Sequence, residues 1–78
     1  MTRLLVVDDH EIVRAGIKQL LSDQGEFIVA GEAASGDEAV KMVREASWDV
    51  VLLDISMPGM NGIEALAQIR HIKPEQPV

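Results

Sequence analysis

Short apolar runs alternate with amphipathic stretches along the chain. Residues 4–7 and Val50–Leu53 are uninterrupted runs of mostly branched apolar residues. Such runs are typical of strands that are buried on both faces of a parallel sheet. Residues 27–31 form a third run of this kind and are a further strand candidate.

Apolar residues at helical spacing predict three helices, one after each strand. The first covers residues 11 to about 23. The second begins at Ser35, which forms the capping pattern S-x-x-E with Glu38. The third begins after Asn61 and stops before Pro74. The positions expected to face the core are Val13, Ile17, Leu20 and Leu21 in the first helix, Ala39, Val40, Val43 and Ala46 in the second, and Ile63, Leu66, Ile69 and Ile72 in the third.

The resulting order, βαβαβα, predicts an α/β fold with a parallel sheet covered on both faces. In a doubly wound sheet the chain moves from strand one outward to strand two and then returns to the other side of strand one. The expected strand order is therefore 2-1-3. Ligands bind such sheets at the switch point, which here falls between strands one and three.

Length and composition bound the chain to one small globular domain. It has 78 residues, of which 47% are apolar and 26% are charged. The absence of cysteine excludes disulfides and thiolate metal sites, which agrees with a reducing compartment such as the cytoplasm. The first apolar run is too short for a signal peptide, and no run is long enough to span a membrane.

The net charge of −6 makes this segment by itself a poor nucleic-acid binder, because a nucleic-acid footprint would be basic. General solubility accounts for most of this acidity. Three aspartates, however, stand at positions that solubility does not explain.

Asp8 and Asp9 directly follow strand one, and Asp54 directly follows strand three. Parallel strands bring all three to one edge of the sheet, on both sides of the predicted switch point. Carboxylates packed together repel one another unless protons or a cation intervene. Oxygen ligands suit a hard cation such as Mg²⁺, which keeps several waters that a phosphoryl oxygen can replace. The pattern predicts a Mg²⁺-assisted phosphate site.

A single aspartate after a strand is more often a turn or helix N-cap than a metal ligand. For Asp9 alone that interpretation would be preferred, and the three aspartates together favour the cation. Asp54 could serve as a third ligand or as a nucleophile, since a carboxylate can accept phosphate covalently. Sequence spacing does not separate these two roles.

Two segments resemble the receiver domain of two-component response regulators. They are V-V-D-D-H at 6–10 and L-L-D-I-S-M-P-G-M-N-G at 52–62, and the match continues along the whole chain. Asp-Asp-His followed by V-R-x-G at 13–16 is most similar to the LuxR/FixJ-type subgroup of transcriptional regulators. The resemblance implies a flavodoxin-like (CheY-like) fold and a regulator that is not an enzyme.

The resemblance also implies a role for each site residue. Asp54 matches the phosphoacceptor, Asp9 the residue that binds Mg²⁺ directly, and Asp8 its neighbour, which acts directly or through water. Ser56 matches the position whose backbone carbonyl completes the metal site. The expected donor is a phosphohistidine on a sensor histidine kinase or a phosphotransfer protein, and small acyl phosphates can replace it.

Other residues allow both a functional and a structural interpretation. Val13, Arg14 and Ile17 match the kinase-docking helix of the family, although Val13 and Ile17 are better explained as core. Residues 57–59, Met-Pro-Gly, would shape the phosphate pocket or serve ordinary turn chemistry. His10 could be a base or a ligand, and a solvated residue at the helix entry is preferred.

The family fold has five βα units, whereas residues 1–78 supply three. The hydroxyl residue of strand four, the lysine of strand five and any output domain lie outside them. We therefore expect slow phosphorylation, no contact with DNA except through an output domain, and no membrane partner. The edge of Val50–Leu53 would be exposed, which predicts self-association.

Two other functions compete with the receiver assignment. A Mg²⁺-dependent aspartyl phosphohydrolase would usually carry a second acid two residues after its nucleophile, where this chain has Ser56. A plain interaction module would keep the fold without phosphate chemistry. The full set of carboxylates argues against that second alternative for the parent protein. For residues 1–78 alone, a folded, self-associating module without phosphotransfer stays an alternative, because two of the five βα units lie outside them.

Overall fold

The computed structural model describes residues 1–57 and 59–78. The elements are β1 (Thr2–Val7), α1 (Glu11–Ser22), β2 (Phe27–Ala33), α2 (Gly36–Glu45), β3 (Val50–Leu53) and α3 (Gly62–Ile72). The predicted alternation of strands and helices is confirmed. Within the described ranges, no helix combines the length and the apolar character needed to cross a membrane.

The sheet has the predicted order β2-β1-β3, with β1 paired in parallel to both neighbours. Val7 lies opposite Leu53 on one side and opposite Ala33 on the other, so the three strands end at the same edge. The predicted strands 4–7 and 27–31 were too short. Polar residues extend both, because strand pairing continues beyond the apolar run, from Thr2 opposite Phe27 onward.

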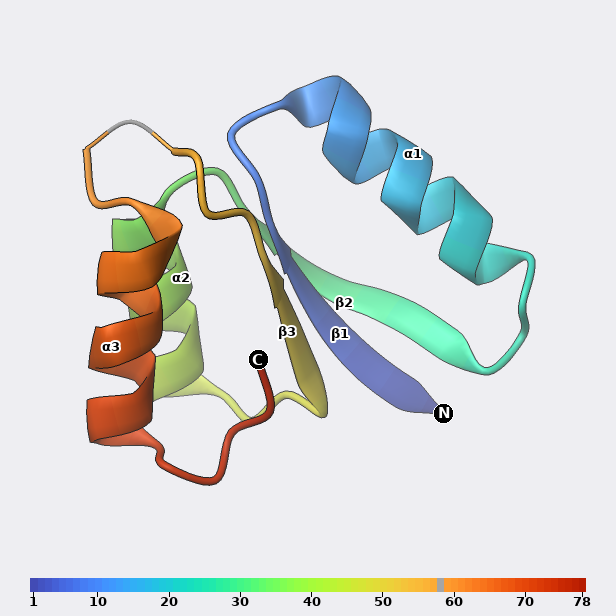
Figure 1. Cartoon of the computed structure of the whole chain (residues 1–78). Helices are drawn as coiled ribbons and strands as arrows, with labels where there is room; N and C mark the ends of the chain where they lie inside the picture. The colour runs from blue at the N-terminus through green and yellow to red at the C-terminus, as the bar shows by residue number, and fades with distance from the viewer. Residues whose placement is uncertain (58) are drawn as a thin grey trace.

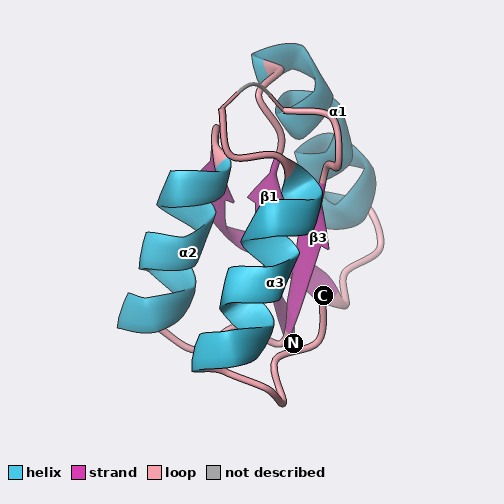
Figure 2. Ribbon diagram, turned by 60° about the vertical axis from the view of Figure 1, so that its left-hand side comes forward, coloured by secondary structure: helices cyan, strands magenta, loops and turns pink. Residues whose placement is uncertain are grey.

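Helices α2 and α3 cover one face of the sheet, and α1 lies on the other (Figure 1, Figure 2). The main core fills the space beneath α2 and α3. Its fully buried residues come from the sheet and from the two helices above it, namely Leu5, Val7 and Val51 from the sheet, Ala39 and Val43 from α2, and Ala65 and Ile69 from α3.

Trp48 closes this core before β3. Its side chain is buried, and its indole Nε1 donates a hydrogen bond to the carbonyl of Met42 at 3.1 Å. The Arg3 guanidinium lies 5.3 Å from the ring centroid. Gly31 lies beneath the ring, where a Cβ would stand 2.5 Å from its edge.

Both predicted helix caps are present. The Glu38 N–H donates to Ser35 Oγ at 3.2 Å, and the Glu38 carboxylate accepts from the Ala34 N–H at 2.9 Å. In α3 the Glu64 N–H donates to Asn61 Oδ1 at 2.9 Å. These bonds satisfy N–H groups that a helix start otherwise leaves without partners.

The predicted inner face of α3 was wrong at Ile63, whose side chain is 63% exposed. The buried row is Gly62, Ala65 and Ile69. A row that repeats every third residue rotates away from the face of a helix with 3.6 residues per turn. Small residues also occupy the place where α3 comes nearest to the loop after β3.

The apolar stripe of α1 was expected to be core, yet within this fully described helix no residue is buried. Val13 is 43% exposed and Leu20 is 70% exposed, while Ile17 is half-buried. Helix α1 packs mainly against β2. The part of the face that belongs to β3 therefore has little cover, and Leu52 is 38% exposed there.

The outer edge of β3 was predicted to be open, and it is only partly so. The Val51 N–H donates to the carbonyl of Pro77 at 2.9 Å. This contact places Pro77 beside β3 and gives one N–H of its outer edge a backbone partner.

Candidate metal centre

Backbone hydrogen bonds place the acidic residues at the ends of the strands. The Asp8 N–H donates to the carbonyl of Ala33 at 3.0 Å, which ties the end of β1 to β2. The Asp54 N–H donates to the carbonyl of Val7 at 3.0 Å, which ties the end of β3 to β1. Two of the three acidic residues are thus held by the sheet itself.

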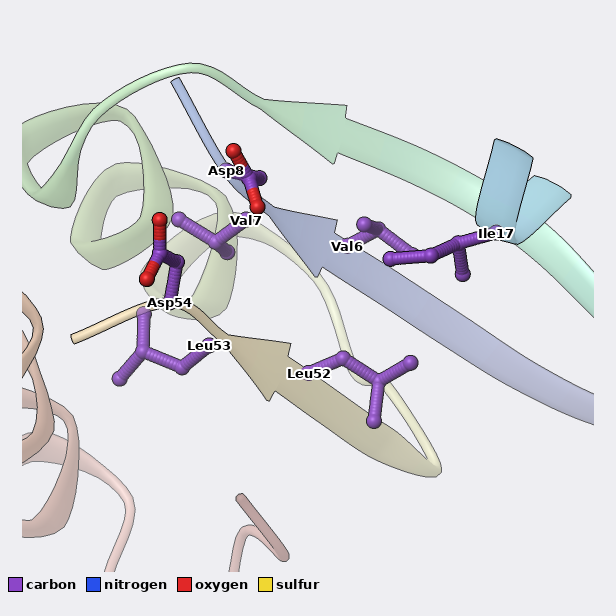
Figure 3. Close-up of a pocket in the computed structure, with 7 residues that line it drawn as sticks. All are labelled: Val6, Val7, Asp8, Ile17, Leu52, Leu53 and Asp54. Carbon is purple, nitrogen blue, oxygen red and sulfur yellow. The ribbon is translucent and has the colours of Figure 1, made fainter. Parts of the chain in front are cut away.

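The three carboxylates that the sequence predicted to converge, Asp8, Asp9 and Asp54, lie close together. Asp8, Asp9, His10 and Asp54 each offer a ligand atom, and these atoms lie within 4.8 Å of one another. Figure 3 shows Asp8 and Asp54 at the neighbouring ends of β1 and β3. An open hollow of about 370 Å³ extends from them along the α1 side of the sheet, past Ile17 and Leu52.

Asp8 is the buried polar residue of this cluster, at 9% exposure. Its Oδ1 accepts from the His10 N–H at 2.8 Å and lies 2.9 Å from His10 Nδ1. Burial disfavours the charged carboxylate, but these His10 contacts and the nearby Arg14 charge outweigh it. The pKa of Asp8 is therefore lowered, so Asp8 is ionised and available to a cation.

His10 stands at the N-cap of α1 with its side chain 65% exposed, which agrees with a solvated residue at the helix entry. Its ring also reaches the carboxylates, with Nδ1 3.0 Å from Asp9 Oδ1. The hydrogen bond to Asp8 and the Asp9 charge raise the pKa of His10. The adjacency of the three residues was the sequence signal for this contact.

Asp9 carries a buried oxygen without a hydrogen bond among the described residues. This oxygen is Oδ1, which approaches His10 Nδ1 but lacks the geometry of a hydrogen bond. Buried polar atoms normally have partners, and an exception calls for an explanation such as an ion. A cation beside Asp9 would supply that partner.

Asp54 is half-buried, and its carboxylate is oriented by the loop that follows. The Ser56 N–H donates to Asp54 Oδ1 at 3.0 Å. Ser56 therefore contacts the Asp54 carboxylate through its N–H group. The role expected for its carbonyl as a metal ligand stays a prediction.

The rest of this loop is held against the fold. Met57 is buried in the core, and Gly59 has a φ of 73°, a conformation that favours glycine. Pro58 lies outside the described residues. At the start of α3 the Gly62 N–H donates to the carbonyl of Ile55 at 3.0 Å, and a Cβ on Gly62 would stand 2.5 Å from Ile55 Cα. Gly62 thus allows the start of α3 to approach the backbone after β3 closely.

Arg14 was expected among the kinase contacts, but its guanidinium turns toward the acidic edge. Nη1 donates to the carbonyl of Asp8 at 2.6 Å, and Nε donates to Glu32 Oε1 at 3.2 Å. Lys18 also donates to Glu32, at 3.3 Å. A glutamate directly after a predicted strand, with two basic residues one helical turn apart, was the available sequence signal.

The donor set suits a hard divalent cation. Carboxylate oxygens from two neighbouring strands converge, and one of them is buried without a hydrogen bond. Mg²⁺ is usually held in proteins by one or two carboxylates together with waters and phosphate oxygens. The residues present therefore fit Mg²⁺ and leave room for a phosphoryl group in the adjoining hollow.

Comparison with known proteins places these features in a family. Residues 4–78 match the response regulator receiver domain. The response regulator UvrY of Escherichia coli (strain K12) is 52% identical over 69 residues, which are 88% of this chain and 32% of UvrY. The chain thus spans about a third of the length of this curated relative.

Solved structures agree. A LuxR-family two-component response regulator from Aurantimonas sp. SI85-9A1 superposes with a TM-score of 0.92 at 38% identity, over 97% of this chain and 54% of that one. The response regulator TrrA of Thermotoga maritima, in complex with Mg²⁺-BeF, has a TM-score of 0.89 at 37% identity, over 97% of this chain and 64% of TrrA. TrrA is also known in complex with the histidine kinase ThkA.

Proposed function

This chain belongs to the response regulator receiver family, and on that premise we propose that Asp54 accepts a phosphoryl group while Asp8 and Asp9 hold Mg²⁺. The observation that carries the proposal is the meeting of the three carboxylates at the switch point, with a buried oxygen of Asp9 that has no hydrogen bond. A purely structural set of aspartates would normally give that oxygen a hydrogen bond, whereas His10 Nδ1, at 3.0 Å, does not form one.

Each residue of the cluster has a distinct part. Asp8, kept ionised by its hydrogen bonds, and Asp9 supply the negative charge that attracts the cation. The Ser56 N–H fixes Asp54 through Oδ1, which leaves Oδ2 free to attack. The Ser56 carbonyl is proposed as a further metal ligand. The Mg²⁺ ion, when bound, neutralises charge that develops on the phosphoryl oxygens.

The transfer forms one bond and breaks one. An Asp54 carboxylate oxygen attacks the phosphorus of a phosphohistidine, an acyl phosphate forms, and the P–N bond breaks. The imidazole of the donor leaves with the electron pair and takes up a proton. No oxidant or further reactant is needed.

The partner implied by this chemistry is a sensor histidine kinase or a phosphotransfer protein. The pairing of TrrA with ThkA supports a kinase partner. Ile12 and Val13 on α1 are exposed at 87% and 43% and are available for contact. Arg14 faces inward and is less accessible than the sequence suggested. We place this exchange in the cytoplasm, where the cysteine-free chain would meet the kinase.

The chain is proposed to correspond to the first three βα units of a receiver. It covers 54% to 64% of the receiver chains compared above. The parent is proposed to be a transcriptional regulator, with DNA contacted only by an output domain. Phosphorylation of residues 1–78 alone should be slow, because removal of positive charge near a transferring group raises the barrier.

Intact mass after incubation with Mg²⁺ and acetyl phosphate tests the acceptor. We expect one phosphoryl adduct that is lost at alkaline pH, and no adduct in Asp54→Asn. Asp23→Asn, an exposed aspartate at the far end of α1, is the matched control and should behave as the wild type. An adduct that persists in Asp54→Asn would overturn the assignment.

Self-association through β3 is a second proposed property. Strand β3 stands at the edge of the sheet, and Leu52 is 38% exposed on its uncovered face. Apolar edge strands of this kind tend to pair. Size-exclusion chromatography with light scattering at low micromolar concentration should show a dimer or larger species. Leu52→Lys should shift it toward the monomer. A wild-type monomer under these conditions would reject the idea.

A further inference from the structure

The Arg14 guanidinium is the one cationic group, among the described residues, that donates a hydrogen bond to the backbone of the acidic cluster. Its side chain is only 16% exposed, which is low for an arginine on the first helix of a small domain. It bridges two elements, since Nη1 bonds to Asp8 and Nε bonds to Glu32 at the end of β2.

Arg14 donates its hydrogen bond to the carbonyl oxygen of Asp8, which belongs to the peptide between Asp8 and Asp9. The preceding peptide is anchored by the sheet, because the Asp8 N–H donates to Ala33. The carbonyl of Asp8 is bound by Arg14 at 2.6 Å. Rotation of this peptide would change the direction of the Asp9 side chain, whose carboxylate belongs to the acidic cluster and carries the buried oxygen without a hydrogen bond.

We propose that Arg14 is a positioning residue for the metal-binding pair, acting through the Asp8 carbonyl. This inference rests on the proposed function, because it assumes that Asp8 and Asp9 bind Mg²⁺. Arg14 does not contact the cation. It fixes the peptide from which the Asp9 carboxylate extends, and Glu32 in turn fixes the guanidinium.

Charge and position predict opposite effects for the loss of Arg14. A cation near Asp8 repels Mg²⁺, so removal of its charge alone would tighten Mg²⁺ binding, by roughly a few-fold at most in physiological salt. Loss of a group that orients metal ligands typically weakens metal binding about 10- to 100-fold. The sign of the change therefore identifies the role.

Lys18 provides a matched control. It shares Glu32 with Arg14, through Nζ and Oε2 at 3.3 Å, and stands one turn further along α1. No contact joins it to Asp8 among the described residues. Loss of Lys18 removes a positive charge and a Glu32 partner but leaves the Asp8 carbonyl bound.

The experiment measures the Mg²⁺ dissociation constant by calorimetry, at fixed pH and 0.15 M salt, for the wild type and three variants. Arg14→Met keeps an apolar stem of similar length and should bind Mg²⁺ about 10- to 100-fold more weakly. Arg14→Lys can reach Asp8 or Glu32 but not both in the same geometry, and should fall between. Lys18→Met should stay within about two-fold of the wild type, because its charge is exposed and screened.

Circular dichroism and urea unfolding of each variant keep loss of fold separate from loss of position. If Arg14→Met does not fold, Arg14→Lys carries the test, and an unchanged constant there overturns the proposal. Unchanged or tighter binding in folded Arg14→Met also overturns it, as does equal weakening in Lys18→Met. A wild type that binds no Mg²⁺ overturns the proposed function as well, which distinguishes the two failures.

Discussion

Gly62 shapes the acidic edge although it has no side chain. Its position against the backbone of Asp54 and Ile55 leaves no room for a Cβ. The φ of Gly62 is not positive, so the requirement for glycine here is the close approach of α3 to the backbone of Asp54.

Gly62→Ala should therefore destabilise the fold by about 1–3 kcal/mol, the usual cost of forced overpacking. It should also weaken Mg²⁺ binding, because Asp54 has to shift. Gly16→Ala is the control, since a Cβ there meets nothing within 4 Å and helix propensity favours alanine by about 0.5–1 kcal/mol. Urea unfolding measures the stability of both variants, and calorimetry measures their Mg²⁺ dissociation constants. Equal effects of the two substitutions would contradict this account.

At the scale of single residues, the sequence located the carboxylates but not their supports. Asp8, Asp9 and Asp54 were predictable because each follows an apolar run, and parallel strands must end together. The contacts of Arg14 depend on side-chain direction across two elements. Spacing along one helix does not encode that direction.

Among the elements, α3 shows best how periodicity succeeds and fails. The helix and its Asn61 cap were predicted, whereas its inner face was misplaced by one row. Ile69 is fully buried, and Ile63, on the same helix, is 63% exposed. The contact face is set by small residues that a search for large apolar side chains does not register.

The two isoleucines permit a direct comparison. Ile69→Ala should cost about 2–5 kcal/mol, because it leaves a cavity in the core. Ile63→Ala should change stability by less than about 0.5 kcal/mol, as surface substitutions usually do. Chemical unfolding followed by the fluorescence of Trp48 measures both. A comparable loss in the two variants would show that the described face of α3 is incorrect.

Helix α1 is attached differently, through few apolar contacts and a charged bridge to β2. Glu32 accepts from both Lys18 and Arg14. The hydrogen bond from Lys18 lowers the pKa of Glu32, burial opposes this, and Arg14 adds to the lowering. The docking of α1 should thus depend on the ionisation of one carboxyl group.

The sign of this dependence follows from the lowered pKa. The contribution of Glu32 is fully present above its ordinary pKa of 4.5 and is lost as the pH falls through the lower value of the folded state. Amide exchange in α1 should accelerate in that window before the rest of the chain responds. Glu32→Gln should exchange faster at neutral pH and lose this pH dependence. A wild-type profile in that variant would argue against the bridge.

For the whole molecule, the order of strands and the two-sided arrangement of helices followed from the alternation of apolar runs and helical stripes. The extent to which the helices cover each face of the sheet could not be predicted from this alternation. An apolar stripe on a helix is buried only where another element lies opposite it. Helix α1 packs mainly on β2 and leaves Leu52 partly exposed.

A small domain of this kind should be measurably stabilised by the Mg²⁺ ion that we propose it binds. At Mg²⁺ concentrations 100-fold above the dissociation constant, the free energy of unfolding should rise by about 2.7 kcal/mol. Thermal unfolding with and without Mg²⁺, at equal ionic strength, measures this. Asp9→Asn should remove most of the gain, and Asp23→Asn should keep it. A gain of equal size in Asp9→Asn would attribute the effect to ions in general.

The last hydrogen bonds at this edge of the sheet are donated by the N–H groups of Asp8 and Asp54, to the carbonyls of Ala33 and Val7. Strands that fray from this edge would release the acidic residues first, while the centre of β1 stayed paired. This edge of the sheet would then exchange between an ordered and a locally unfolded state, and a bound cation would stabilise the ordered state. Hydrogen exchange of those two amide protons, followed by NMR, would report this local ordering at each residue, well before any global property of the molecule changed.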